Sequence, residues 1–418
     1  MNDVVITGVG PVTSVGAGAE ALWDSLANGR SNAAPRPLLV DLGRVELLPV
    51  ASMPDVPEVP GLDLHTAYLK SQDAEGYRDL AYALLAIELA LADAGLDYDR
   101  DENNIGVIQA FEAPGVERTV GELFGLFGKP LPTDAPPPVY DMLSPYFYSM
   151  QPFLYVHLVG KAFGLHGFST SVHNACSSGA FALDLAAQRI RAGHADVMIV
   201  AAGEAFDTGV RLEWFRRLEL YAQTTQMCPF DTKRQGFYVG EGAAAIVLES
   251  EQHASSRGAR PFAKYLGGGF TQQSWKQVIP DVRSAQLSAA ITRAMTTTAT
   301  RWEEIDLITP HGACTQLSDG YESSCLEQAM AEHKTDAIAT AFKPHVGHML
   351  AASGVIEMVC AILALKHQTV PATLNTDAEN TRLPVPLATI PVQREIRKVL
   401  KLSTGFTGHD AASLFQAV

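Results

Sequence analysis

Short apolar segments alternate with helix-forming segments along the whole chain, and this alternation restricts the fold to a layered α/β architecture. Both halves contain, in the same order, a strand, a sharp turn and a helix rich in Gly or Ala. Residues 128–138 are too rich in proline for a helix or a central strand and are expected to form a loop. The expected strands cover 4–9, 104–110, 197–202, 243–249, 305–309 and 398–403, and the expected helices cover 19–27, 77–94, 180–192, 285–297 and 354–365.

Charge and cysteine content narrow the functional class. The 418 residues carry a net charge of −15, which argues against a nucleic-acid partner. The five cysteines are odd in number and lack paired or metal-like spacing, so we expect a reduced cytoplasmic protein without a metal. The apolar segment at 4–9 reads as a strand rather than a signal peptide. We also expect no membrane span, which needs about 18 apolar residues.

Cys176 is the candidate nucleophile. An extended run that ends near Val172 meets the helix expected at 180–192, and the small residues 177–179 allow a sharp turn between them. A sulfur near a helix N-terminus is favoured as the thiolate. Two histidines lie in similar settings, His311 after the strand at 305–309 and His348 before the helix at 354–365. Together the three residues indicate a catalytic constellation.

The motifs around these residues resemble those of the elongating β-ketoacyl-acyl carrier protein synthases, which are condensing enzymes of the thiolase superfamily. The resemblance spans the chain, and its departures from the family pattern favour a diverged, polyketide-type ketosynthase. The motifs cover residues 4–16, 144–147, 171–180, 193–198, 229–243, 305–312, 341–354 and 405–408.

The resemblance implies a five-layer αβαβα thiolase fold built from two similar halves. Residues 1–250 would carry the nucleophile, and residues 251–418 would carry both histidines. The implied partners are an acyl carrier protein and a second chain, in a homodimer or in a heterodimer with a related ketosynthase or chain-length factor. Neither a membrane nor a nucleic acid is implied as a partner. No cofactor is implied, because the carrier protein supplies the phosphopantetheine arm.

The resemblance also assigns the chemistry. Cys176 would accept an acyl chain as a thioester, and the family histidines match His311 and His348. These would bind the carbonyl of a malonyl thioester and stabilise the enolate formed as carbon dioxide leaves. Fixed donors of this kind are what a developing oxyanion requires.

Further positions match supporting roles in the family. Lys343 and Glu322 would form a pair that orients His348. The backbone amides of Cys176 and Phe406 would form a second oxyanion hole, with Phe406 as the gate. Thr315 and Thr407 are assigned to substrate binding.

Related classes fit less well. A degradative thiolase would carry a second catalytic cysteine near the C-terminus, but residues 403–408 contain none. Chain-initiating synthases use Cys-His-Asn, whereas here the third position is His348. Chain-length factors lack the nucleophile, which this chain keeps.

Several positions depart from the family pattern, and Ala313, Thr404 and Thr407 are the ones expected around the gate and the pantetheine arm. Ala313 lacks a hydroxyl that normally binds pantetheine, and Thr407 replaces a glycine. These changes predict an altered gate and leave two alternatives open. One is acyl transfer from Cys176 to a nucleophile other than malonyl. The other is a weakly catalytic subunit that resembles a chain-length factor.

Overall fold

The main β-sheet of the computed structural model consists of two halves with one topology. The structure describes residues 3–54, 58–127, 151–331 and 333–418, so the predicted loop at 128–138 and the motif at 144–147 lie outside the described residues. The first half has the strand order β6-β5-β7-β9-β1, and the second has the order β12-β11-β15-β16-β10. Numbered along the chain, both orders read third, second, fourth, fifth, first.

Strand directions repeat as well. In each half the second, third and fourth strands are parallel, and the fifth lies antiparallel to both the fourth and the first. The halves join where Val5 and Ile6 pair with Lys264 and Ala263. The strands are β1 (Val4–Thr13), β5 (Gly106–Ala110), β6 (Ser169–Val172), β7 (Val197–Glu204), β9 (Gly242–Ser250), β10 (Ala263–Gln272), β11 (Leu307–Thr309), β12 (Ile338–Ala339), β15 (Lys398–Thr404) and β16 (His409–Gln416).

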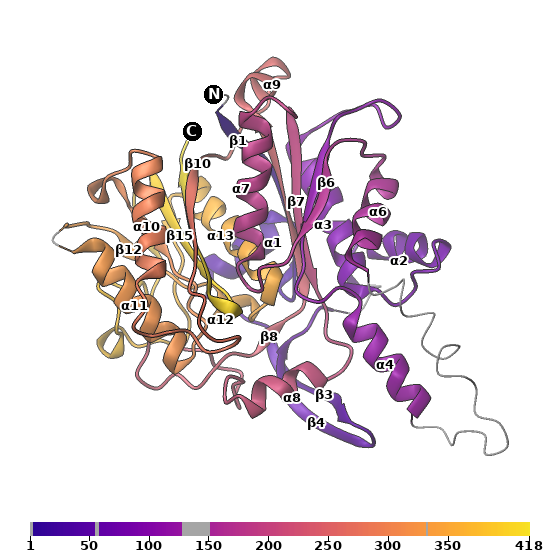
Figure 1. Ribbon diagram of the computed structural model, residues 1–418, viewed down its shortest axis with the longest axis horizontal. Coiled ribbons are helices and arrows are strands. Elements are labelled where there is room, and N and C mark those ends of the chain that lie inside the picture. The colour runs from indigo at the N-terminus through magenta and orange to yellow at the C-terminus, as the bar shows by residue number, and fades with distance from the viewer. Residues whose placement is uncertain (1–2, 55–57, 128–150, 332) are drawn as a thin grey trace.

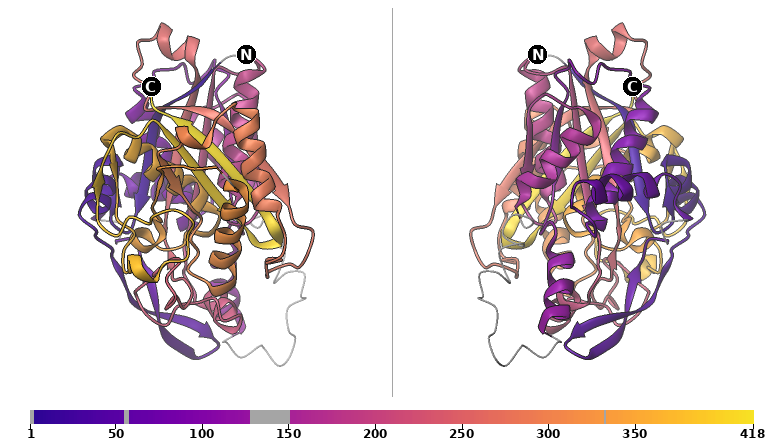
Figure 2. Two further views of the ribbon diagram at one scale, coloured as in Figure 1. Left: turned by 90° about the vertical axis from the view of Figure 1, so that its left-hand side faces the viewer. Right: turned by 90° about the vertical axis from the view of Figure 1, so that its right-hand side faces the viewer.

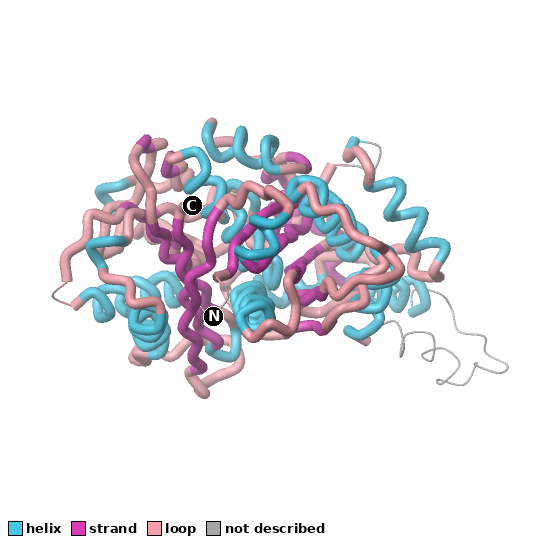
Figure 3. The backbone as a smooth tube through the Cα atoms, turned by 90° about the horizontal axis from the view of Figure 1, so that it is seen from above, coloured by secondary structure: helices cyan, strands magenta, loops and turns pink. Residues whose placement is uncertain are grey.

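Helices cover both faces of each half-sheet, which gives five layers (Figures 1 and 3). Helix α3 (Arg78–Ala94) packs on the outer face of the first half, and α10 (Gln286–Thr297) packs on the outer face of the second. Helices α7 (Ser178–Arg191) and α13 (Ser353–His367) form the middle layer. The side views show the C-terminal half on one side of the molecule and the N-terminal half on the other (Figure 2). The thiolase fold predicted from the sequence is therefore confirmed.

Successive side chains along a strand point to opposite faces of the first half-sheet, and they belong to a separate hydrophobic core on each face. On β9, Ala244, Ile246 and Leu248 face the middle layer, whereas Ala243, Ala245 and Val247 face α3. This period of two is what a sheet covered on both faces requires. The predicted domain boundary at 250/251 falls between β9 and the next helix, and it stays a prediction.

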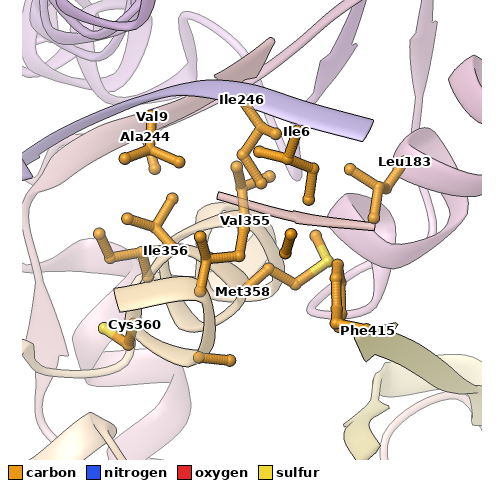
Figure 4. Packing of buried hydrophobic residues seen from close by; sticks show 14 of the residues in the cluster. Ile6, Val9, Leu183, Ala244, Ile246, Val355, Ile356, Met358, Cys360 and Phe415 are labelled. Carbon is orange, nitrogen blue, oxygen red and sulfur yellow. The ribbon is translucent and has the colours of Figure 1, made fainter. Parts of the chain in front are cut away.

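Helix α13 is buried on all sides because it lies between the two half-sheets. Val355 and Met358 pack there on the side of Ile6 and Phe415 (Figure 4). The window Leu350–His367 is long and apolar enough to cross a membrane, contrary to the sequence-based expectation, but 89% of it is buried inside the fold. Its apolar character is that of a core helix.

The two middle-layer helices meet at their N-termini. A Cβ atom on Gly179 would lie 2.7 Å from the backbone nitrogen of Val355 and 2.9 Å from the carbonyl carbon of Gly354. Glycine at 179 therefore permits the two helix starts to approach each other backbone to backbone. This crossing brings the loops that precede α7 and α13 to one place.

A smaller sheet and a short helix lie beside that place. Strands β3 and β4 form a hairpin that pairs with β8, and α8 packs against β3. The remaining elements are β2 (Gly16–Ala17), β3 (Ala33–Asp41), β4 (Arg44–Ala51), β8 (Val239–Gly240), β13 (Thr369–Val370), β14 (Val392–Gln393), α1 (Ala19–Ala27), α2 (Leu62–Ser71), α4 (Val116–Phe127), α6 (Pro152–Phe163), α8 (Val210–Arg217), α9 (Glu251–Ser256), α11 (Gln316–Met330) and α12 (Lys343–Val346), with 3₁₀ turns at Trp302–Glu304, Leu350–Ala352, Ala378–Asn380 and Phe406–Gly408.

Candidate active site

Cys176 lies in a sharp turn between β6 and α7, as the sequence predicts. Ala175 has a φ of +49°, in the left-handed region that residues with a side chain rarely adopt. The Ser178 hydroxyl stabilises the turn, because it accepts the amide of Asn174 at 2.8 Å and donates to the carbonyl of Ala175 at 2.6 Å. The Cys176 side chain is buried beside the start of α7.

The same turn recurs before α13 and carries His348. Leu350 has a φ of +44°, and the Ser353 hydroxyl accepts the amide of Met349 at 2.9 Å. Ser353 follows Ser178 by 175 residues, and His348 follows His173 by the same interval. His348 therefore occupies the position in the second half that His173 occupies in the first half.

His311 follows β11 in a loop that is held by Glu322 of α11. The two carboxylate oxygens of Glu322 accept the amides of His311 at 2.5 Å and of Gly312 at 2.9 Å. Gly312 has a φ of +56°, a conformation that glycine adopts without strain. Glu322 thus positions the His311 backbone.

A cavity of about 290 Å³ brings the three predicted residues together. The rings of His311 and His348 lie edge to face, with centroids 5.5 Å apart and an interplanar angle of 81°. Most of the other lining side chains are apolar, as is usual in pockets that bind small molecules. The lining consists of Cys176, Leu218, Glu219, Leu220, Phe237, Gln273, Val278, Ile279, Pro280, His311, Ala313, Thr315, Leu317, Ser318, Tyr321, His348, Thr404, Gly405 and Phe406.

Hydrogen bonds assign the tautomer of each imidazole. Lys343 Nζ lies 3.3 Å from Nδ1 of His311, and because an ammonium only donates, this nitrogen accepts. Among the described residues the Ser353 hydroxyl contacts no acceptor other than Nδ1 of His348, at 2.8 Å, so its proton is assigned to that nitrogen. Both rings therefore carry their proton on Nε2.

Burial keeps both imidazoles neutral. It lowers the pKa of His311 well below its usual range, and the positive charges of Lys343 and Lys401 lower it further. The same causes, burial first, lower the pKa of His348. Neutral rings with Nε2 protons are hydrogen-bond donors that need not lose a proton to act.

Lys343 is paired with Glu357 rather than with Glu322. Its Nζ donates to Glu357 Oε1 at 2.5 Å and to the His311 carbonyl at 2.5 Å. The predicted Lys343–Glu322 pair is therefore corrected: Glu322 is occupied by two backbone amides, and α13 places Glu357 within reach of the lysine. Lys401 of β15 binds the other oxygen, Oε2, of Glu357 at 2.7 Å.

Sequence reasoning missed Glu357 and Lys401. Each is a charged residue inside an otherwise apolar element, between Ile356 and Met358 in one case and between Leu400 and Leu402 in the other. A buried charge needs a partner of opposite sign. From this rule the sequence alone could have indicated that Glu357 and Lys401 form an ion pair.

The thiol of Cys176 is not held as a thiolate by its surroundings. Burial raises the pKa of Cys176 well above its ordinary value, and the carboxylate of Glu112 raises it further, while Lys343 opposes the change. The helix N-terminus alone predicted the opposite direction. The free protein therefore keeps the sulfur protonated.

Two backbone amides beside the sulfur are available to a ligand. Neither the amide of Cys176 nor that of Phe406 donates to another residue within the described ranges. Phe406 is partly buried, and its ring contacts those of Trp214 and Phe215. The second oxyanion hole assigned to these two amides stays a prediction.

The residues that depart from the family pattern lie beside Phe406 or line the cavity. Thr404 and Ala313 line the cavity. Thr407 has a φ of +64°, so the position does require the conformation that a glycine adopts freely. Its side chain is exposed and its hydroxyl donates to the carbonyl of Phe406, outside the cavity lining. Thr315 lines the cavity, and its hydroxyl caps α11 by accepting the amide of Ser318.

Comparisons with known proteins agree with this architecture. Models of the N-terminal and C-terminal domains of β-ketoacyl synthases match residues 1–254 and 262–377. A 3-oxoacyl-[acyl-carrier-protein] synthase 2 of Rhizobium meliloti is 31% identical over 100% of this chain and 99% of its own length. A putative polyketide β-ketoacyl synthase 1 of Streptomyces halstedii is 29% identical over 98% of this chain and 96% of its own length.

A solved structure extends the likeness to the whole fold. The ishigamide ketosynthase/chain length factor superimposes with a TM-score of 0.83 at 25% identity, and the match covers 100% of this chain and 99% of that chain.

Proposed function

Because the chain belongs to the β-ketoacyl synthase family, we propose that it catalyses the decarboxylative condensation of a Cys176-bound acyl chain with malonyl-acyl carrier protein. The product would enter polyketide or specialised fatty-acid synthesis. The observation that carries the proposal is the convergence of Cys176, His311 and His348 on one cavity, with both imidazoles neutral and protonated on Nε2.

The first half-reaction loads the nucleophile. The Cys176 sulfur attacks the thioester carbonyl of an acyl-carrier protein, and the tetrahedral oxyanion is bound by the amides of Cys176 and Phe406. Collapse releases the carrier thiol, which takes the proton that the cysteine loses. Because the thiol is protonated in the free protein, loading requires that proton to move as the substrate binds.

The second half-reaction forms the carbon–carbon bond. The malonyl thioester carbonyl accepts Nε2–H from His311 and His348, and the carbon–carboxylate bond breaks to release carbon dioxide. The enolate is stabilised by the two donors, and its carbon attacks the acyl-Cys176 thioester. The carbon–sulfur bond then breaks and returns the sulfur as a thiolate, which takes up a proton.

The partners follow from the reaction. We propose an acyl carrier protein as the donor of both substrates, with its phosphopantetheine arm in the apolar cavity and Thr315 along its path. The ketosynthase/chain length factor among the similar structures supports a second, related chain as partner. A cytoplasmic location remains a prediction.

A second candidate is a weakly catalytic subunit of a heterodimer, favoured by the similarity to the ketosynthase/chain length factor. Acyl transfer from Cys176 to a nucleophile other than malonyl is the third outcome of the same test. Purified protein is incubated with acyl-carrier protein, and intact mass is read before and after malonyl-carrier protein is added, with Cys176→Ala as the control. Acylation at Cys176 followed by carbon dioxide release supports the proposal. Absence of acylation contradicts it, and acylation without carbon dioxide release favours transfer to another nucleophile.

A further inference from the structure

Lys401 is a buried charge in the middle of an apolar strand. Its side chain is 1% exposed, and its neighbours along β15 include Leu400 and Leu402. Its ammonium donates to the carbonyl of Leu402 and forms an ion pair with Glu357 Oε2 at 2.7 Å. An apolar side chain would suit this layer without the desolvation that a lysine requires. The charge therefore needs an explanation beyond packing.

Two lysines share one carboxylate at this point. Lys343 binds Glu357 Oε1 at 2.5 Å, and Lys401 binds Oε2. With one lysine, Glu357 would cancel the positive charge beside the histidines. With two, an uncompensated positive charge remains next to His311, whose Nδ1 is contacted by Lys343.

The other charged and titratable groups around Lys401 do not cancel that charge. Glu322 from α11 faces it, but burial raises the pKa of this carboxyl to about 7, so near neutral pH it is only partly ionised. The remaining neighbours are Cys360 of α13, whose pKa burial raises, and the two neutral imidazoles.

We propose that Lys401 is a positioning residue that neutralises Glu357 and so leaves the charge of Lys343 free to stabilise the enolate bound between His311 and His348. This inference rests on the proposed function and deepens it. An anion that forms at Nε2 of the two rings gains from a nearby uncompensated cation in a water-poor site. The loading of Cys176 forms its oxyanion at a different pair of donors, and the charge of Lys343 acts on this step only through the pKa of the thiol, which it lowers, so loading depends less on this charge.

The test compares the two half-reactions in Lys401→Met, which keeps most of the length of the side chain and removes its charge. Lys398→Met is the matched control, because Lys398 lies on the same strand but pairs with Glu304 at 2.9 Å. Carbon dioxide release from malonyl-carrier protein is expected to fall about tenfold in Lys401→Met. Acylation of Cys176 should stay within about twofold, and the control should match the wild type.

A second measurement does not depend on turnover. The proton resonances of His311 and His348 are titrated by NMR in the wild type, in Lys401→Met and in Glu357→Gln. Loss of the Lys401 cation should raise the titration midpoints of both rings, and loss of the Glu357 charge should lower them. In the pH profile of the rate of carbon dioxide release, the acid limb should move to higher pH in Lys401→Met and to lower pH in Glu357→Gln.

The results distinguish the two proposals. A wild type without carbon dioxide release contradicts the proposed function, while the NMR titration still tests the charge cluster. Equal losses in both half-reactions of Lys401→Met, or midpoints that do not move in either variant, would overturn the role assigned to Lys401. If Lys401→Met does not fold, the shift in Glu357→Gln decides the question.

Discussion

The Ser353 hydroxyl lies 2.8 Å from Nδ1 of His348, and this contact leaves Nε2 of the ring to carry the proton that faces the cavity. In Ser353→Ala the ring of His348 should therefore be free to rotate and to move its proton to Nδ1. We expect carbon dioxide release from malonyl-carrier protein to fall about tenfold, because one donor to the enolate is no longer fixed. A stopped assay of carbon dioxide with the purified variant measures this.

Ser178→Ala is the matched comparison. Ser178 occupies the same place in the first half, but it holds the turn of Cys176 rather than an imidazole. This variant should slow acylation of Cys176 and leave carbon dioxide release near the wild-type rate. If the two serine variants affect the half-reactions alike, the separate roles of the two turns are wrong.

Glu322→Gln should loosen the loop of His311. A carboxamide has one acceptor oxygen where the carboxylate has two, so one of the amides of His311 and Gly312 loses its partner. The unfolding free energy is expected to fall by about 1–3 kcal/mol. Urea unfolding measures it, with the exposed Glu327→Gln of the same helix as the control.

The pH dependence of the unfolding free energy tests the raised pKa of Glu322 separately. Burial raises the pKa of Glu322 from 4.5 to about 7, so its ionisation takes away stability as the pH rises across this range. The glutamine variant has no such loss. The difference in unfolding free energy between wild type and Glu322→Gln should therefore narrow from pH 4.5 to pH 7. A difference that widens over this range contradicts the raised pKa of Glu322.

Much of the fold and of the site follows from the sequence, and the exceptions have physical causes. The alternation of strands and helices predicts the layers, and α1 begins and ends where the pattern of residues 19–27 places it. The ion pairs could not be read from the spacing of a motif. Glu357 reaches Lys343 only because α13 and α12 fold together, so the motif spacing pointed to Glu322 instead. The state of Cys176 also depends on burial, which its turn alone does not reveal.

Glu112→Gln should make Cys176 more reactive toward iodoacetamide. Burial and the charge of Glu112 raise the pKa of the Cys176 thiol, so removal of that charge lowers it and increases the thiolate fraction at a given pH. The alkylation rate of the Cys176 peptide between about pH 8 and pH 10 is measured by mass spectrometry. Glu122→Gln, which removes an exposed carboxylate of α4, should leave the rate unchanged. A variant at Glu112 that alkylates no faster would show that this charge does not act on the sulfur.

Thr407→Gly should free the gate beside Phe406. The left-handed backbone at this position costs a residue with a side chain about 1–2 kcal/mol, and glycine adopts it without that cost. Glycine also loses more entropy on folding, by about 0.5–1 kcal/mol, so overall stability should change little. We expect faster acylation of Cys176 in Thr407→Gly than in Thr407→Ala, which keeps the Cβ atom. Equal acylation rates in the two variants would rule out backbone strain as the restraint on the gate.

A single-turnover experiment tests the central claim most directly. Protein that carries an acyl group on Cys176 is freed of excess substrate and mixed with malonyl-carrier protein, and both proteins are followed by intact mass. The account predicts that Cys176 loses its acyl group while the carrier gains it joined to the malonyl unit less carbon dioxide. An acyl group that stays on Cys176, is hydrolysed, or moves to the carrier without a new carbon–carbon bond would contradict it.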